Sequence, residues 1–293
     1  MKRHPEPAAT MFQAYIELTK PKITFMILIS TALGYYIGGE GVVQAYSFIL
    51  TLFGTAIVSG GAGTLNHYTE RDLDMLMERT CSRPIPAGII GANTALTFGL
   101  IQVLFGLTIL LLAANLLTAF LALLTAFLYI FVYTPLKRIT WLNTTIGAVP
   151  GALPPMGGWA AATGNIDFEA WILFAILFLW QHPHFYAIAL MCKDDYMKAG
   201  FKMLPVLEND GRRTNRQIIW HAFLLIPISV MPVYAGILGP LYLWGALIFG
   251  VIYLTASLPL IRNYSIKNAK LLLKVSVLYL PCLLGLILVD YNI

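Results

Sequence analysis

The chain has few charged residues and few cysteines. Only 11% of its 293 residues are Asp, Glu, Lys or Arg, whereas a soluble domain carries about a quarter, so a surface exposed mainly to water is excluded. Cys81, Cys192 and Cys282 lack the spacing of a zinc site, and we expect unpaired thiols. Without low-complexity tracts or a soluble linker, 1–293 is predicted to be a single domain.

Apolar residues make up 58% of the chain and gather in stretches of roughly 18 residues or more, long enough to cross a bilayer. Spans must be helices or barrel strands to satisfy their backbone groups, and barrel alternation is absent. We therefore predict an all-α membrane protein, without a cleavable signal peptide, whose nine transmembrane helices form a single bundle. The predicted spans are 22–39, 46–65, 93–113, 116–134, 142–162, 169–191, 217–236, 240–260 and 271–289.

The basic residues predict the orientation of this bundle. All 19 Lys and Arg residues lie in the N-terminal segment and in alternate loops, or at their edges, and the intervening loops have none. Because cytoplasmic loops are enriched in Lys and Arg, segment 1–20 and the long loops 66–92 and 192–216 are predicted to be cytoplasmic. The C-terminus, with Asp290, would lie outside. This asymmetry explains the net charge of +5 better than nucleic-acid binding does. The long polar loops lie on the cytoplasmic side, so we expect the site there, in a central cavity of the bundle that opens to that side.

The segment at the end of the second span carries three side chains whose oxygen atoms could bind a metal ion. Asn66, Glu70 and Asp74 are spaced by four residues, so a helix would place them on one face. The two acids would repel each other there, and a divalent cation would offset this repulsion. Carboxylate and amide oxygens suit Mg²⁺ that also holds phosphate oxygens. The alternative is a solvated loop in which acids and bases pair without function.

The same segment supplies further charge. Asp72 falls on another face of the helix and could serve a neighbouring ion or pair with a base. Arg71, Arg79 and Arg83 follow closely and would bind the remaining phosphate oxygens.

A second charged cluster follows the sixth span. Asp194 and Asp195, with Lys198, would complete a two-sided clamp on a metal-bound diphosphate if both clusters faced one cavity. The alternative is a chance pair of acids at a helix end. Lys137 and Arg138, which close the fourth span, are equally well interpreted as phosphate ligands or as membrane anchors.

Polar residues also occur within the sixth span, where they are costly. Gln181, His182 and His184 lie within 169–191. Functional interpretations are contact with heme, proton transfer or stabilisation of a cation. The alternative is hydrogen bonding between helices.

Five segments together resemble the intramembrane prenyltransferases, whose members have nine helices and two acidic motifs, and among them the branch that farnesylates heme. These segments are LTKPK at 18–22, NHYTERDLD at 66–74, YTPLKR at 133–138, WQHPHF at 180–185 and DDY at 194–196. The chain departs from the usual pattern at Glu70, where Asp is common, and at Lys198, where a second motif often has Asp.

The resemblance implies transfer of a farnesyl group from farnesyl diphosphate to a vinyl group of heme b, with Mg²⁺ as cofactor and heme b as a substrate. The implied metal ligands are Asn66, Glu70, Asp74, Asp194 and Asp195, and Asp72 joins them as a catalytic residue. The implied diphosphate ligands are Arg71, Arg79, Arg83, Lys137, Arg138 and Lys198. The implied acceptor contacts are His184, His182, Gln181 and Tyr133.

The resemblance also implies that the protein lies in a bacterial inner membrane, where it contacts membrane lipids and proteins of later heme A synthesis or oxidase assembly. Three other functions stay open from the residues alone. One is prenyl transfer to a quinone precursor or lipid, the second is transport, and the third is a non-catalytic role in oxidase assembly. Dependence on Mg²⁺ and release of diphosphate would distinguish an enzyme from the last two.

Overall fold

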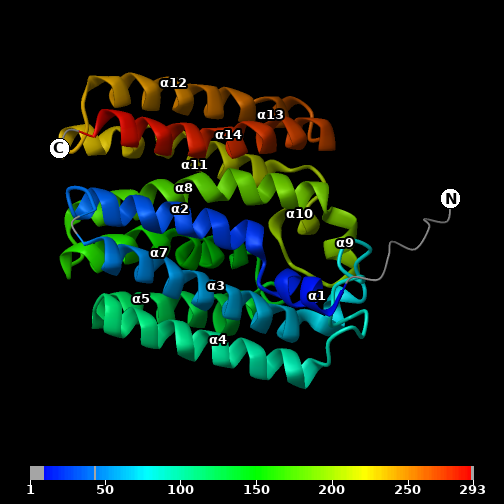
Figure 1. Ribbon diagram of the computed structural model, residues 1–293. Helices are drawn as coiled ribbons and strands as arrows, with labels where there is room; N and C mark the ends of the chain where they lie inside the picture. Colours follow the sequence, from blue (N-terminus) through cyan, green and yellow to red (C-terminus); the bar gives the residue numbers. More distant parts are fainter. Residues whose placement is uncertain (1–9, 43, 292–293) are drawn as a thin grey trace.

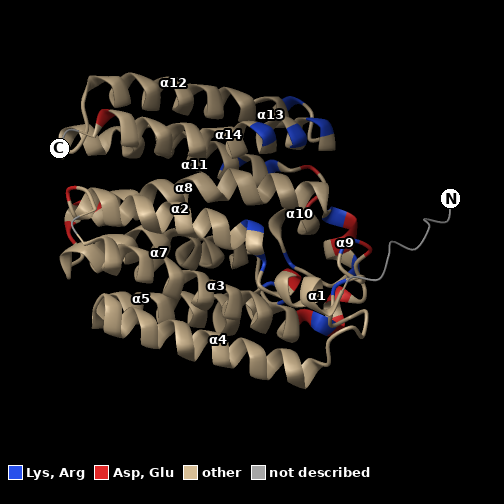
Figure 2. Ribbon diagram, in the orientation of Figure 1, with Lys and Arg blue, Asp and Glu red and all other residues tan. Residues whose placement is uncertain are grey.

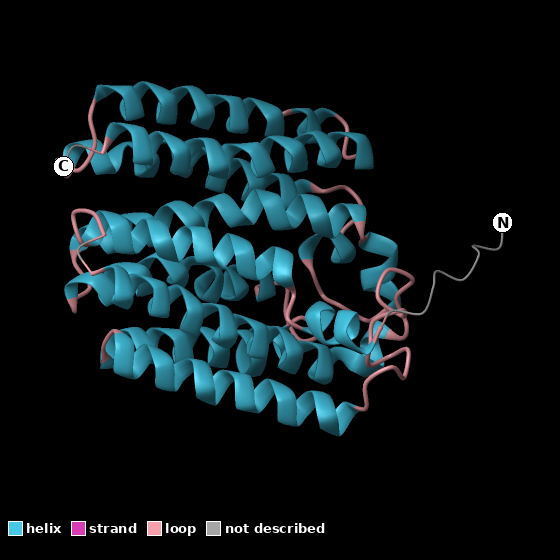
Figure 3. Cartoon of the chain, viewed as in Figure 1, coloured by secondary structure: helices cyan, strands magenta, loops and turns pink. Residues whose placement is uncertain are grey.

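The computed structural model describes residues 10–42 and 44–291, and within these the regular elements are helices (Figure 3). Segments 1–9 and 292–293 lie outside the described residues, together with Lys2 and Arg3 of the predicted cytoplasmic segment 1–20. The long helices lie side by side in one bundle, with α4 at one edge and α12 at the other (Figure 1). The all-helical fold class is therefore confirmed.

The helices follow the predicted spans closely, and three helices, those that begin at Ala45, Arg212 and Ile266, are longer by three residues or more. The elements are α1 Met11–Leu18, α2 Pro21–Gly38, α3 Ala45–Asp74, α4 Ala92–Ala113, α5 Leu116–Phe127, η1 Leu128–Tyr133, α6 Thr134–Leu136, α7 Asn143–Thr163, α8 Phe168–Met191, α9 Lys193–Lys198, α10 Leu204–Leu207, α11 Arg212–Tyr234, α12 Pro240–Ser257, α13 Pro259–Arg262 and α14 Ile266–Asp290. α3 continues nine residues beyond the predicted span 46–65, so that its polar end extends past the apolar stretch.

Seven helices of the described part are long and apolar enough to cross a membrane. They are α3, α4, the continuous α5–η1–α6 segment, α8, α11, α12 with α13, and α14. Their outward faces carry large apolar side chains such as Phe53, Leu104 and Trp244, which are exposed. The chain is thus an integral multi-pass membrane protein. α2 and α7 have 18 and 21 residues at two further predicted spans, but do not meet the same measure of hydropathy, so the count of nine stays a prediction.

Small residues let neighbouring helices approach closely, as they do in membrane bundles. On α3 and α4, a β-carbon added to Gly61 would lie 2.8 Å from the carbonyl oxygen of Gly99. Gly54 and Gly106 face each other in the same way two turns away. This glycine seam holds α3 and α4 together along their length, and it fixes the position of the helix that carries the polar residues.

Charged side chains gather at one end of the bundle. In Figure 2 the Lys and Arg residues lie at the end that contains α1, α9 and the start of α14, and the opposite end shows acidic residues alone. The alternation of basic and non-basic loops in the sequence is therefore an alternation between the two ends of the bundle. The polar end of α3 lies at the basic end.

The N-terminal segment contains a helix that apolar run length does not reveal. α1 begins with a capping box, in which Thr10 and Gln13 bond each other's backbone N–H groups. Ala14 and Leu18 are its buried residues, and they pack with Ile85 and Ile90 of the loop after α3. α1 therefore lies against the basic end of the bundle, beside the polar end of α3.

Candidate functional site

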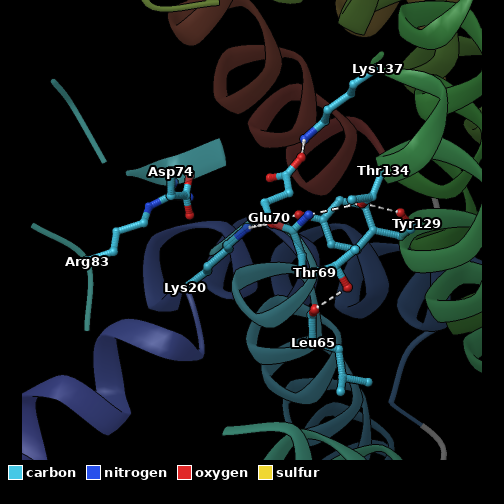
Figure 4. A network of polar contacts seen from close by, with 10 residues as sticks. Lys20, Leu65, Thr69, Glu70, Asp74, Arg83, Tyr129, Thr134 and Lys137 are labelled. Carbon is cyan, nitrogen blue, oxygen red and sulfur yellow. Dashed lines mark hydrogen bonds and ion pairs between the residues drawn. The ribbon is translucent and has the colours of Figure 1, made fainter. Parts of the chain in front are cut away.

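The last three turns of α3 present a buried polar face. Asn66, Glu70 and Asp74 are 1%, 4% and 0% exposed, and the continuous helix stacks them on the same side. The face predicted from the spacing of four is therefore present. Buried polar groups need partners, and each of these three has one that comes from elsewhere in the chain (Figure 4).

All three partners are basic side chains. Lys20 donates to the Asn66 amide oxygen, the Lys137 ammonium lies 2.7 Å from a Glu70 oxygen, and one Arg83 nitrogen lies 2.9 and 2.8 Å from the two Asp74 oxygens. Two carboxylates and one amide oxygen thus face three basic groups. Of the predicted diphosphate ligands, the structure brings Arg83 and Lys137 to this face.

Lys137 reaches Glu70 from the loop that follows α6. Its ammonium also lies 4.7 Å from the centre of the Tyr133 ring and 5.6 Å from that of Phe201. Burial alone would lower the pKa of Lys137, but the charge of Glu70 and the two nearby tyrosines outweigh this and raise it. The lysine is therefore held as a cation beside the Glu70 carboxylate.

A π-helical segment, η1, places two tyrosines beside the buried face of α3. In η1 the backbone N–H of Thr134 bonds the carbonyl of Tyr129, five residues earlier, and the Thr134 hydroxyl bonds that carbonyl as well. Tyr129 and Tyr133 stack with ring centres 5.9 Å apart. The Thr134 hydroxyl also accepts a bond of 3.0 Å from the Asn66 amide nitrogen. Such π segments often occur at functional sites.

The structure also brings in residues that the sequence did not single out as site residues, namely Lys20, Tyr129 and Thr134. Lys20 bonds both Asn66 and the Tyr129 hydroxyl. Its burial lowers its pKa to about 7, which the charge of Glu70 opposes. The sequence signals at Lys20 are its place in the segment 18–22 that carries the resemblance and its position directly before an apolar span, and neither distinguishes a site residue from a membrane anchor.

The second acidic cluster lies next to the loop that follows α3. The Asp195 carboxylate accepts bonds of 3.2 and 3.3 Å from the backbone N–H groups of Glu78 and Arg79. Lys198 pairs with Glu78 at 2.7 Å, and Asp194 is exposed. The two charged segments are therefore neighbours, as expected, but in this arrangement Asp195 holds the loop and does not face Glu70.

Other predicted residues are not buried with this face. Asp72 is exposed and lies 3.7 Å from Arg71, whose guanidinium also stacks 4.6 Å above the Tyr68 ring. Arg79 and Arg138 are exposed. Of the two alternatives for Asp72, the structure has the pairing with a base.

The polar residues of α8 bond neighbouring helices. Gln181 donates to the Ala148 carbonyl of α7, and His184 bonds Ser276 of α14 at 2.8 Å. His182 bonds Thr145 of α7 at 3.3 Å and also the Phe178 carbonyl. The Tyr133 ring packs against Gly147, also on α7. The side chains of Gln181, His182 and His184 therefore form hydrogen bonds between helices, which was the alternative to contact with the acceptor. Contact with the acceptor stays a prediction.

The donor set at the buried face suits Mg²⁺. The described residues contain no group of three or more His, Cys, Asp and Glu side chains placed to hold a metal, and the buried face offers two carboxylates and one amide oxygen. Mg²⁺ prefers such hard oxygens and is often bound by one or two carboxylates together with substrate phosphates. Lys137 and Arg83 would then be available to the phosphate oxygens.

Comparisons with known proteins agree with this chemistry. A profile described as the UbiA prenyltransferase family matches residues 27–278. A protoheme IX farnesyltransferase of Solibacter usitatus is 45% identical, over 94% of this chain and 98% of its own.

Two solved structures share the fold. A structure of digeranylgeranylglyceryl phosphate synthase has a TM-score of 0.81 at 20% identity and covers 96% of this chain and 99% of its own. A UbiA homologue from Archaeoglobus fulgidus, bound to DMAPP and Mg²⁺, has a TM-score of 0.69 at 15% identity and covers 94% and 99%.

Proposed function

Because the chain belongs to the UbiA prenyltransferase family, we propose that it transfers a farnesyl group from farnesyl diphosphate to a vinyl group of heme b. The observation that carries the reaction class is the buried face of Asn66, Glu70 and Asp74 with its basic partners. The choice of heme as acceptor rests on the relative from Solibacter usitatus, which is named for that substrate.

In this proposal Asn66, Glu70 and Asp74 would hold Mg²⁺, which would supply positive charge to the leaving diphosphate. Its support is the hard oxygen donor set and the Archaeoglobus fulgidus homologue bound to DMAPP and Mg²⁺. Lys137 and Arg83 bind phosphate oxygens, which are geometrically suited to guanidinium and ammonium donors.

Seven charged residues outside the buried face also take part in the proposal. Asp194 and Asp195 would hold a further ion in the complex with diphosphate, and Asp72 would add negative charge near them. Asp194 and Asp195 lie on α9, and Asp195 bonds the backbone of Glu78 and Arg79 in the loop that follows Asp74. Further phosphate contacts come from Arg71, Arg79, Arg138 and Lys198.

The reaction breaks the bond between the first farnesyl carbon and the diphosphate oxygen, and the allylic cation reacts with a vinyl carbon of heme b. Water adds to the cation that results, and one proton is released. The apolar surroundings of the site keep water away from the allylic cation before the carbon–carbon bond forms.

Heme would lie on the α7 and α8 side of the site. His184, His182, Gln181 and Tyr133 are its proposed contacts, and their present bonds to α7 and α14 are single hydrogen bonds that a ligand can replace. Heme b from the membrane would reach these four residues through a central cavity that opens to the cytoplasmic side.

The membrane arrangement follows from the charge distribution. We propose nine spans, with α2 and α7 added to the seven apolar helices, because both are long enough and pack against each other inside the bundle. The basic end is then cytoplasmic in a bacterial inner membrane and the C-terminus lies outside. The product would pass to later steps of heme A synthesis or oxidase assembly.

The test is incubation of membranes that contain the protein with heme b, Mg²⁺ and farnesyl diphosphate, followed by mass analysis of the extracted hemes. The expected product is heme with one farnesyl group and one added water. Turnover of a quinone precursor or a lipid in place of heme would refute the proposed acceptor, and absence of diphosphate release with any acceptor would refute prenyl transfer.

A further inference from the structure

Lys20 occupies an unusual backbone position beside the site. It lies between α1 and α2 with φ 50° and ψ 57°, in the left-handed region, and Pro21 follows it. A residue with a β-carbon in this region costs about 1 kcal/mol or more, and such strain persists where the surroundings enforce it. The fold thus holds Lys20 in place against a local preference.

The surroundings are arranged to guide the lysine side chain toward α3. A β-carbon added at Gly63 would lie 3.3 Å from Lys20 Cγ and 3.5 Å from its Cδ. The glycine therefore leaves room for the aliphatic part of Lys20 to cross α3. At its end, the ammonium bonds Asn66 and, at 3.0 Å, the Tyr129 hydroxyl (Figure 4).

Lys20 differs from the other two basic residues in what it bonds. Lys137 and Arg83 each pair with a carboxylate, whereas both hydrogen-bond partners of Lys20 among the described residues are neutral groups. A partly buried ammonium is poorly compensated by an amide oxygen and a phenol, because charge-assisted bonds to anions are about twice as strong. An ammonium also has three donors, so an anion entering this site would give Lys20 the charged partner that its present hydrogen bonds lack.

We propose that Lys20 is a diphosphate-binding residue, which leaves the Asn66 amide oxygen and turns to a phosphate oxygen when diphosphate and Mg²⁺ bind. This inference rests on the proposed function and adds a residue to its site. In the absence of diphosphate, Lys20 keeps the amide oxygen satisfied. Once Lys20 has turned away, that oxygen is free to act as a ligand.

The experiment measures binding of inorganic pyrophosphate in the presence of Mg²⁺ by calorimetry on the purified full chain. Lys20→Met should weaken binding about tenfold to a hundredfold, the loss expected for one hydrogen bond to a charged group. Lys20→Gln keeps an N–H donor for Asn66 and should weaken binding equally, whereas Lys20→Arg should retain most of it. Lys22→Met is the matched control, because Lys22 is exposed on the first turn of α2, and it should bind as the wild type does.

A purely structural role for Lys20 predicts a different pattern. Lys20→Gln would then bind pyrophosphate as tightly as the wild type, and that result overturns the inference even if Lys20→Met fails to fold. The turnover assay adds a second readout, in which the KM for farnesyl diphosphate should rise in Lys20→Gln and the KM for heme should not. Failure of the wild type itself to bind pyrophosphate with Mg²⁺ would refute the proposed diphosphate site, a separate outcome.

Discussion

The stability of the basic end of the bundle should be highly sensitive to the loss of either partner of the ion pair between Glu70 and Lys137. The two charged atoms lie 2.7 Å apart, and the side chains are 6% and 11% exposed. At an effective dielectric constant of about 20, two such charges attract each other by about 6 kcal/mol. Much of this is offset by the cost of removing both groups from water.

Removal of one partner should therefore cost more than the pair contributes. Lys137→Met leaves the Glu70 carboxylate buried without its cation, and this should lower the free energy of unfolding by about 3–5 kcal/mol. Glu70→Gln should also be destabilising. The double variant should recover most of the loss, because it buries no uncompensated charge, yet it should stay inactive. Chemical unfolding in mild detergent, followed by circular dichroism, measures these differences.

Lys198 and Glu78 provide a matched comparison, because their charged atoms are also 2.7 Å apart while their side chains are 48% and 84% exposed. Solvent screens such a pair, so Lys198→Met should change stability far less than Lys137→Met. Equal effects of the two substitutions would refute the reasoning that burial, rather than distance, determines the contribution of the pair.

Three further predictions concern the site and the bundle. Asp74→Asn should lower turnover about a hundredfold or more while the protein stays folded by circular dichroism, since a charged ligand beside the leaving group is lost. Chelation by EDTA should abolish diphosphate release, and added Mg²⁺ should restore it, which a colorimetric phosphate assay after pyrophosphatase treatment measures. Gly158→Ala should destabilise the protein by about 1–3 kcal/mol or more, because the new methyl group would overlap the Thr31 carbonyl of α2. Gly157→Ala, which meets open space on the same helix, should be neutral or slightly stabilising when both variants are compared by thermal unfolding.

The sequence predicted the bundle well because two independent signals, the ends of the apolar runs and the positions of Lys and Arg in the loops, mark the same helix ends. It placed the starts of α4 and α8 within one residue. It missed the first turns of α11 and α14, which begin five residues before the predicted spans 217–236 and 271–289. Those turns carry lysines and arginines, and a helix can continue into a polar region where an apolar run has already ended.

The site was predicted in part for a similar reason. The spacing of Asn66, Glu70 and Asp74 is a local pattern, and a helix converts it directly into a shared face. The partners of these residues are not local, since Lys20 lies 46 residues from Asn66 and Lys137 lies 67 residues from Glu70. Only the packing of α2, η1 and the loop after α6 around α3 brings them together.

The basic residues at this end of the bundle serve two purposes that can be separated. Membrane orientation requires positive charge on one side and is indifferent to which residue carries it, whereas the site requires an ammonium at one place. Lys137 is turned inward onto Glu70, and Arg138, its neighbour in the sequence, is exposed. Arg138→Gln should therefore weaken pyrophosphate affinity by about threefold at most, because a phosphate contact made by an exposed side chain is screened by solvent and salt. Lys137→Gln should weaken pyrophosphate binding at least tenfold, because one charge-assisted bond is lost. Equal losses in the two variants would mean that the overall positive charge of this end, and not the geometry around α3, attracts the diphosphate.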